Sequence, residues 1–283
     1  MKQYLELLKD ILDNGEEKDD RTGVGTRSVF GRSIRFDLRL AFPAVTTKKL
    51  AWKAVVSELL WFLEGSGDEG RLREILYGSR DAKTDHGVAK KTIWSDNANA
   101  PYWTPKATYP GDLGRVYGVQ WRDFGGVDQL LTLIEGLKND PNGRRHIVVS
   151  YNPGEIDQMA LPPCHAMFQM YVNKNKELSC HMYQRSVDTP LGFPFNIASY
   201  ALLTSLVAQV CGYKPGELII STGDTHCYIN QLDSVRMQLQ REPLPPPHLW
   251  LNPAITSIFD FTMDDIRLDG YAHHPGIKYV MAV

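Results

Sequence analysis

The segment at 195–212, FNIASYALLTSLVAQVCG, constrains the fold more than any other part of the chain. It is long, apolar on every side and free of charged residues, and a helix of this kind has to be buried. Segments with the pattern of strands flank it at 146–152, 165–172, 177–185 and 217–221. The pattern predicts an α+β fold in which a large mixed β-sheet packs against a long central helix.

The rest of the chain divides into amphipathic helices, short strands and polar connections. A polar stretch at 79–113, rich in Pro, Gly, Asn and Lys, is interpreted as a long surface excursion, and loops of this length often carry function. No internal repeat or obvious linker interrupts the sequence, which predicts a single domain over residues 1–283. The other predicted elements are helices at 4–12, 51–65, 126–140 and 228–242, a strand at 34–38, a turn-rich segment at 19–31, an extended proline spacer at 243–247 and short strands near the C-terminus.

Composition and charge argue against several classes of function. The formal net charge is −2, so no global basic field attracts nucleic acid or an anionic membrane, and an anionic ligand has to be met by local arginine clusters. The N-terminus lacks the apolar core of a signal peptide, and no run of about 18 apolar residues indicates a membrane span. The four cysteines show no CxxC spacing. We therefore expect neither a disulfide framework nor a metal site, and a reducing, cytoplasmic location.

Cys164, in the stretch LPPCHAMFQM, is either an inert residue at the start of a buried strand or a nucleophile. On a strand, Cys164 and His165 point to opposite faces, so they cannot form a thiolate–imidazole pair. A cysteine hydrolase built on these two residues is therefore disfavoured. An activated thiol needs another partner, and a nearby arginine cluster would lower its pKa.

Other polar residues in apolar surroundings are also candidates, each with a structural alternative. Glu58 in its apolar helix is either paired structurally or a carboxyl with a perturbed pKa. Asn196 either caps the long helix or offers a donor and an acceptor to the edge of a uracil-like ring. The arginines Arg21, Arg144, Arg145 and Arg185 are either solvated charges or phosphate ligands. Four ring side chains could serve either packing or function: Trp94, Tyr117, His226 and Tyr228.

Eight ordered motifs resemble those of the thymidylate synthase family, along the whole chain from residue 1 to 283. They are DDRTGVGT, FPAVTTKKLAWKAVVSELLWFLEG, GRRHIVVSYNP, ALPPCHAMFQMYV, YQRSVD, GFPFNIASYALL, GDTHCYINQ and HPGIKYVMAV. The resemblance implies dUMP as substrate and 5,10-methylenetetrahydrofolate as co-substrate, with no metal, membrane or nucleic acid required. It also implies a homodimer with the sheet face at its interface.

The resemblance implies a role for each matching residue. Cys164 adds to C6 of the uracil ring, which makes C5 nucleophilic. Asn196 reads the uracil edge, Glu58 and Tyr117 handle protons, and Asp188 contacts the pterin. The phosphate ligands implied are Arg21, Arg185 and Ser186, with Arg144 and Arg145 reaching the partner's phosphate; the deoxyribose ligands are His226 and Tyr228. The folate site implied comprises Lys48, Trp94, Leu161, Asp188, Gly192 and Val283.

Several positions depart from the family pattern, and they bear on the fate of the exocyclic methylene. Hydride transfer to it gives dTMP, whereas addition of water gives 5-hydroxymethyl-dUMP. Trp94 and the terminal MAV favour methylation, and a carboxamide at Asn196 favours dUMP over dCMP. A nucleotide- or RNA-binding protein is an alternative from another class. The departures are Arg115, Ser95, Tyr151, Thr189, Pro190 and Thr222.

Overall fold

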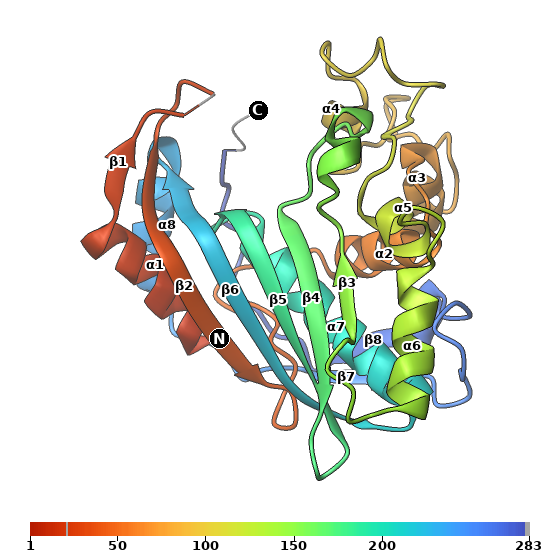
Figure 1. Cartoon of the computed structure of the whole chain (residues 1–283). Helices are drawn as coiled ribbons and strands as arrows, with labels where there is room; N and C mark the ends of the chain where they lie inside the picture. The colour runs from red at the N-terminus through yellow and green to blue at the C-terminus, as the bar shows by residue number, and fades with distance from the viewer. Residues whose placement is uncertain (21, 281–283) are drawn as a thin grey trace.

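Six strands form one sheet in the computed structural model, which describes residues 1–20 and 22–280 (Figure 1). Their order is β1-β2-β6-β5-β4-β3. The β5–β6 pair is parallel and the other neighbouring pairs are antiparallel, so the sheet is mixed, as the sequence predicted. The strands are β1 Glu16–Lys18, β2 Thr26–Asp37, β3 Ile147–Val149, β4 His165–Val172, β5 Glu177–Asp188 and β6 Lys214–Tyr228.

The long helix α7, Phe193–Cys211, connects β5 to β6 and packs against both. Two parallel strands that follow one another in sequence need such a crossover. Beneath α7, Cys180 and Met182 of β5 are buried, whereas the alternating His181 and Tyr183 are exposed on the other face of the sheet. The predicted packing of a mixed sheet on a long central helix is confirmed.

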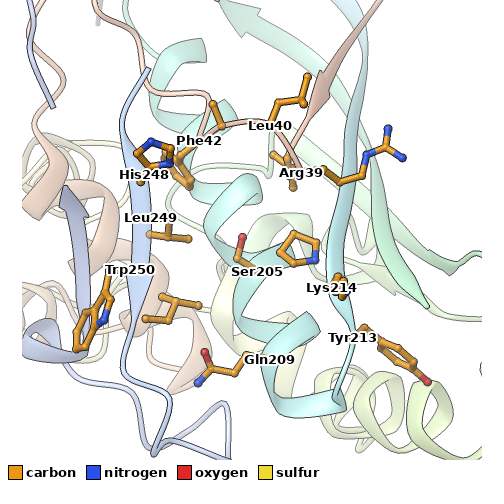
Figure 2. Close-up of a pocket in the computed structure, with 14 residues that line it drawn as sticks. Arg39, Leu40, Phe42, Ser205, Gln209, Tyr213, Lys214, His248, Leu249 and Trp250 are labelled. Atoms are coloured by element: carbon orange, nitrogen blue, oxygen red, sulfur yellow. The ribbon is translucent and has the colours of Figure 1, made fainter. Parts of the chain in front are cut away.

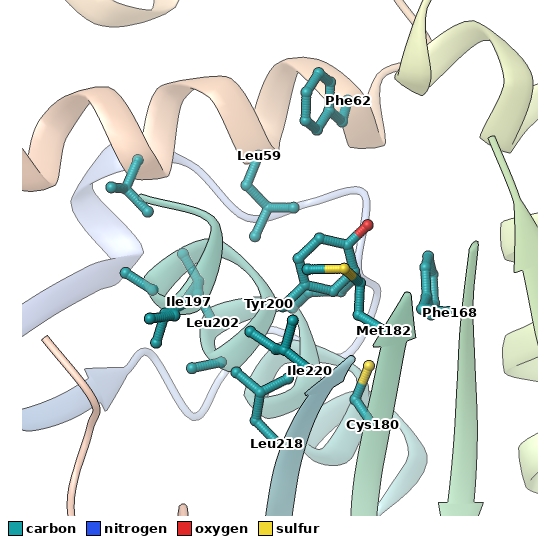
Figure 3. Close-up of a cluster of buried hydrophobic side chains, with 14 of the residues drawn as sticks. Leu59, Phe62, Phe168, Cys180, Met182, Ile197, Tyr200, Leu202, Leu218 and Ile220 are labelled. Carbon is teal, nitrogen blue, oxygen red and sulfur yellow. The ribbon is translucent and has the colours of Figure 1, made fainter. Parts of the chain in front are cut away.

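The core lies between this sheet face and the helices. Figure 3 shows Ile197, Tyr200 and Leu202 of α7 close to side chains of the strands, with Leu59 and Phe62 reaching the cluster from the helix above it. That helix is α2, Trp52–Leu63, which has eight buried residues. The strand side chains in this cluster are Phe168, Cys180, Met182, Leu218 and Ile220.

Within the described residues, α7 is the one helix long and apolar enough to cross a membrane by length and composition. In this structure 83% of its most apolar stretch is buried inside the protein. Packing against the sheet and α2 accounts for its apolar composition, because a helix enclosed on all sides has no face to present to water.

The remaining elements surround this core. Beside the sheet, α1 and α8 pack on one another, and α2 contacts α3, α5 and α7. A separate antiparallel pair, β7 His248–Leu251 with β8 Ile266–Asp269, follows the proline spacer. The helices are α1 Lys2–Asn14, α3 Glu69–Tyr77, α4 Ser95–Ala98, α5 Tyr117–Arg122, α6 Gln129–Asn139 and α8 Leu232–Leu239, with 3₁₀ turns η1 Pro153–Gln158, η2 Ile229–Gln231 and η3 Met263–Asp265.

Two strand predictions are wrong in extent. Residues 26–31, expected in a turn-rich segment, are the first half of β2, and β6 is far longer than the predicted 217–221. The two misread stretches pair with each other, from Thr26 opposite Tyr228 to Phe30 opposite Asp224. The local glycines favour turns, but pairing between these two distant segments makes them strands, because strand preference depends strongly on tertiary context.

The prediction of a surface excursion at 79–113 is also wrong in part. Trp94 and Trp103 are buried, with 4% and 3% of their surfaces exposed. The Trp103 indole donates a hydrogen bond to the Asp112 carbonyl at 2.6 Å. The segment is mostly irregular, but these two side chains anchor it to the core. The helix predicted at 228–242 instead begins as the turn η2 and continues as the shorter α8.

Candidate active site

Most predicted site residues lie at one end of the sheet, uppermost in Figure 1. Cys164 immediately precedes β4, Arg185 and Asp188 lie near the end of β5, and His226 and Tyr228 lie near the end of β6. The start of β4 meets the ends of β5 and β6, because β4 is antiparallel to β5 and β5 is parallel to β6. In register, Asp188 is the neighbour of His226.

The loop that carries Cys164 is held from two sides. The Cys164 backbone N–H donates to the Tyr117 hydroxyl at 2.6 Å. The Arg185 guanidinium donates to the carbonyl oxygens of Pro163, at 2.8 Å, and Pro162, at 2.9 Å. The same guanidinium lies 4.0 Å from Cys164 Sγ. The two prolines therefore give Arg185 a rigid pair of acceptors, and Arg185 in turn fixes the position of the thiol.

The Cys164 thiol is the least expected feature of the site. Burial raises its pKa above the ordinary value, and the opposing effects of Arg185 and of the hydrogen bond with Tyr117 are smaller. Arg185 lowers this pKa, as expected of a nearby arginine, but burial has the larger effect and the net shift is upward. Desolvation disfavours the thiolate more than one guanidinium at this distance stabilises it.

His165 has no role as a base for Cys164. Its Nδ1 lies 2.9 Å from the Tyr200 hydroxyl, and its ring stacks on Tyr117 with centroids 3.9 Å apart. Burial lowers its pKa to about 3, so the imidazole stays neutral. The geometry confirms that the adjacent Cys164 and His165 do not form a nucleophile–base pair, and it removes the basis for a cysteine hydrolase.

Glu58 is partly buried and has no ion-pair partner among residues 1–20 and 22–280. Its Oε1 accepts a hydrogen bond from the Trp94 indole at 2.7 Å. Burial raises its pKa to about 7, and the bond from Trp94 opposes this shift. The Trp94 ring in turn meets the Tyr117 ring edge-on, with centroids 5.9 Å apart. Glu58, Trp94, Tyr117 and Cys164 thus form a chain of contacts that the sequence order does not reveal.

A buried carboxylate that sequence reasoning missed holds the Trp94 turn. Glu69, with 2% of its surface exposed, accepts hydrogen bonds from Thr92 at 2.8 Å and Ser95 at 2.7 Å, and pairs with Arg73. Thr92 and Ser95 lie on either side of the segment that presents Trp94. The only signal in the sequence was an acidic residue in the first turn of α3, which is also an ordinary helix-dipole position.

Asp188 is a buried carboxyl with few charged neighbours. Its Oδ1 accepts from the Leu191 N–H and its Oδ2 from Gln231, each at 3.1 Å. Burial raises its pKa, and the hydrogen bond from Gln231 is the largest opposing effect. Gly192 follows in the same turn, where its N–H donates to the Asp188 carbonyl at 2.9 Å.

Lys48 is buried beside this carboxyl rather than extended into solvent. Its ammonium donates to the Pro190 carbonyl and lies 4.5 Å from the centre of the Tyr279 ring. Burial lowers its pKa to about 8, although the charge of Asp188 opposes this. Its contact with the folate glutamate tail stays a prediction.

The orientation of Asn196 is set by a residue the sequence analysis did not single out. Gln184 donates to the Asn196 carboxamide oxygen at 3.0 Å and to the Ser186 carbonyl at 3.2 Å. Gln184 Oε1 is buried and has no hydrogen-bond partner among the described residues. A buried acceptor without a donor is costly, so this corner of the site is suited to a ligand that brings an N–H or O–H group.

His226, Tyr228 and Ser186 complete the upper end of the sheet. His226 Nδ1 lies 2.9 Å from an Asp224 carboxylate oxygen, and this bond lowers the pKa of Asp224. The His226 and Tyr228 rings meet edge-on with centroids 5.4 Å apart. Ser186 is the register neighbour of Asp224. These groups are close together, but their contact with a sugar or phosphate stays a prediction.

Arg144 and Arg145 do not join this cluster. They are exposed and precede β3, whose Ile147 lies opposite Gln169 of β4. Continuing that register sets Arg145 opposite Tyr171, about 23 Å along β4 from Cys164 at about 3.3 Å per residue. Neither arginine reaches Cys164 of its own chain. Arg21 and Val283 lie outside the described residues.

A small cavity of about 90 Å³ opens beside Glu58 and is lined by Ile93, Phe195 and Tyr77, among others. Leu161 is partly buried against the core. A much larger cavity, about 640 Å³, lies between α7 and β7 (Figure 2). It contains none of the predicted site residues, so cavity size does not identify the site. Among residues 1–20 and 22–280, no cluster of His, Cys, Asp or Glu is arranged to hold a metal ion.

The positions that depart from the family pattern all have structural partners. Arg115 pairs with Glu155 at 2.6 Å, and Thr222 accepts from the Thr225 hydroxyl at 2.6 Å. Ser95 is one of the donors to Glu69. The remaining three contact site residues: Tyr151 faces the Arg185 guanidinium at 5.8 Å, Thr189 donates its N–H to the His226 carbonyl, and Pro190 accepts from Lys48.

Comparison with known families agrees with the resemblance seen in the motifs. A family model described as thymidylate synthase matches residues 2–283, essentially the whole chain. The mixed sheet and central helix are consistent with the fold of that family. The chain belongs to the thymidylate synthase family, whose members transfer a one-carbon unit from methylenetetrahydrofolate to dUMP.

Proposed function

We propose that this protein transfers the one-carbon unit of 5,10-methylenetetrahydrofolate to C5 of dUMP and reduces it by hydride transfer, giving dTMP and dihydrofolate. The observation that carries the proposal is the partly exposed Cys164 thiol, held between Tyr117 and Arg185 at the end of the sheet where the other predicted ligands gather. The family match supports the substrates.

Cys164 is the proposed nucleophile. Its sulfur adds to C6 of the uracil ring, and the electron pair of the C5–C6 double bond moves toward C5 and O4, which makes C5 nucleophilic. Burial raises the thiol pKa, so the thiol proton has to be transferred as the sulfur approaches C6. Arg185, 4.0 Å from Sγ, stabilises the developing negative charge.

Glu58 and Tyr117 have different protonic roles. With a pKa raised to about 7, Glu58 is suited both to give and to take a proton near neutral pH, at O4 of the ring or through water. Burial raises the pKa of Tyr117 well above its usual value. Tyr117 therefore remains a neutral phenol, which orients a water that removes the C5 proton rather than acting as the base itself.

Asn196 is the proposed reader of the base. A carboxamide donates to uracil O4 and accepts from N3–H, whereas cytosine presents an amino group and an unprotonated N3 at the same edge. Gln184 supports this role, because its bond to the Asn196 oxygen fixes the carboxamide, and a carbonyl oxygen has a second lone pair for N3–H. We expect dUMP to turn over faster than dCMP.

Methylation is proposed over hydroxymethylation because the side chains around Glu58 favour a dry site. The Trp94 indole contacts Glu58 and is almost fully buried. The methylene bound at C5 is electrophilic, and water must be kept away until hydride reaches it. Asp188, Lys48, Leu161, Gly192 and Val283 are the remaining residues proposed for the folate side.

The proposed working unit is a homodimer. Arg144 and Arg145 are far from Cys164 in their own chain, so a role in phosphate binding requires a partner's site. On the sheet face opposite α7, the large side chains Tyr171 and Tyr183 are 63% and 42% exposed, which suits a face covered by a second copy. Mixing C164S with the double variant R144A/R145A should restore part of the activity that each lacks alone, and no restoration would count against this arrangement.

The proposal also assigns the protein to the cytoplasm. All four cysteines are unpaired thiols, two of them fully or almost fully buried. A catalytic thiol has to stay reduced to act, and a reducing compartment maintains it.

Product analysis tests the proposed reaction. The protein is incubated with dUMP and methylenetetrahydrofolate, the nucleotide is identified by mass, and dihydrofolate is followed by absorbance. We expect dTMP with equimolar dihydrofolate. A nucleotide heavier by one oxygen, without dihydrofolate, would replace this proposal with hydroxymethylation. C164S should lose turnover but retain dUMP binding, whereas C211S, at the far end of α7, should retain both. A C164S variant that turns over normally would refute the nucleophile.

A further inference from the structure

Gln231 connects three parts of the site through one carboxamide. The residue is fully buried at the end of η2. Its Oε1 accepts from the Tyr228 N–H at 3.0 Å, and its Nε2 donates to Asp188 Oδ2 at 3.1 Å and to the Val280 carbonyl at 3.0 Å. A carboxamide has two N–H donors, so both are committed, one to the carboxylate and one to the C-terminal segment.

The C-terminal segment is attached along the same surface by contacts that do not involve Asp188. The Ser234 hydroxyl donates to the Lys278 carbonyl at 3.2 Å, and the Tyr279 hydroxyl donates to Gln238 at 2.6 Å. Val280 comes last in this row. Figure 1 shows this segment, in dark blue, rising toward the upper end of the sheet. Gln231 is thus where the segment and the Asp188 carboxylate meet one buried side chain.

We propose that Gln231 is a positioning residue that couples docking of the C-terminal segment to the ionised form of Asp188. This inference rests on the proposed function, in which Asp188 contacts the pterin. When Val280 holds one N–H of the carboxamide, the other is directed at Asp188 Oδ2. When the segment leaves, the carboxamide loses the contact that fixes its orientation, and the carboxylate loses an oriented donor.

The neighbours of Asp188 allow this coupling to be measured. Hydrogen bonds from the amide of Gln231 and from the Leu191 N–H favour the ionised carboxyl against the effect of burial. Replacing Gln231 by Met removes both donors at similar volume, together with the acceptor of the Tyr228 N–H, and leaves the titratable groups that face Asp188 in place. The titratable groups around Asp188 are Lys48 before α2, His226 and Cys227 on β6, Tyr4 on α1 and Tyr279 in the C-terminal segment.

The test compares Q231M with S234A, which loosens the same segment without touching Asp188. Hydrogen–deuterium exchange of the peptide containing residues 275–280 should speed up in both variants. The acidic limb of the pH profile for kcat/KM should move upward by about one pH unit in Q231M. It should move in the same direction, by a smaller amount, in S234A, because a looser segment orients the Gln231 carboxamide less well. The KM for methylenetetrahydrofolate should rise several-fold in Q231M, with a smaller change in kcat.

Normal exchange in Q231M, or an acidic limb at the wild-type position in either variant, would overturn the coupling. If Q231M does not fold, Q231N retains a carboxamide too short to hold both partners, and the same two measurements, exchange and pH profile, apply to it. A wild-type protein without turnover would refute the proposed function, and the exchange comparison would then still test the link between Gln231 and the segment.

Discussion

The Trp94 indole nitrogen donates to Glu58 Oε1 at 2.7 Å, and this pair sets the protonation of the site near neutral pH. The bond favours the ionised carboxyl, but burial has the larger effect and raises the pKa of Glu58 to about 7. A carboxyl fully exposed to water would be ionised at this pH and could not donate a proton. The same indole that shields Glu58 from water therefore also limits how far its pKa rises.

Glu58 should make stability depend on pH. Its pKa in the folded protein is about 7 against an ordinary 4.5. A raised folded-state pKa stabilises the protein fully below the unfolded-state value, and this contribution is lost as the pH rises through 7. The free energy of unfolding of the wild type relative to E58Q should fall by about 2–3 kcal/mol between pH 4.5 and pH 8. Urea unfolding at both pH values measures this, and parallel curves for the two proteins would contradict it.

Glu69 should control activity through Trp94 without touching a substrate. E69Q removes the negative charge that accepts from Thr92 and Ser95 and pairs with Arg73. We expect a loss of about 2 kcal/mol in stability, because a buried charged network is broken. Activity should fall in E69Q, as it should in W94F, and the share of 5-hydroxymethyl-dUMP among the products should rise. The matched control E74Q alters only exposed ion pairs, with Arg71 and Arg80, and should leave activity unchanged. An E69Q protein with wild-type product ratios would disprove the positioning role.

Gly223 should tolerate no side chain, whereas its neighbour Thr222 should be replaceable. A Cβ at position 223 would lie 2.6 Å from the Arg185 carbonyl oxygen, and backbone atoms would have to move. Because Arg185 holds the Cys164 loop, G223A should reduce kcat at least about tenfold and destabilise by about 1–3 kcal/mol. T222A loses a buried hydroxyl that donates to the Arg32 carbonyl and accepts from the Thr225 hydroxyl, and it should cost about 1 kcal/mol with activity retained. Steady-state kinetics and thermal unfolding distinguish the pair; equal effects on kcat would contradict the prediction.

The Cys164 thiol should react slowly in the free protein. Burial raises its pKa, so alkylation by iodoacetamide at pH 7 should be slower than that of a free cysteine and should accelerate through the alkaline range. R185Q should raise the pKa further and slow alkylation at a given pH, while R185K, which retains a charge, should lie between R185Q and the wild type. Peptide mass spectrometry separates Cys164 from the other thiols. A fast-reacting Cys164 at pH 7 would show that its thiolate is stabilised by more than Arg185.

The sequence predicted elements well where local pattern and packing agree. The 165–172 strand and the long helix match β4 and α7 closely, because their apolar residues are buried as the pattern indicates. The first half of β2 and the last half of β6 were missed for a different reason. Both are rich in small and polar residues, and their strand form depends on their pairing with each other. No local pattern carries that information.

The site residues also differ in whether local sequence could reveal them. Cys164 and Glu58 could be selected because each is a reactive or polar residue in apolar surroundings, whereas Asp188 was implied by the family resemblance alone. Gln184 and Gln231, which orient Asn196 and Asp188, could not be selected, because a glutamine looks the same in sequence whether it faces water or spans two partners in the core. The direction of the Cys164 pKa shift was also beyond the sequence, since it depends on the balance between desolvation and a guanidinium at a known distance.

The parallel register of β5 and β6 limits where this protein tolerates insertions and deletions. From Cys180 beside Leu218 to Asp188 beside His226, the two strands keep a constant offset. One added or deleted residue in either strand would turn every later side chain to the opposite face, so Asp188 or His226 would leave the site. The irregular segment between α3 and α4 is not part of this ladder and can change length while the Trp94 turn stays anchored. Length differences among related chains should therefore be concentrated there and be nearly absent from these two strands.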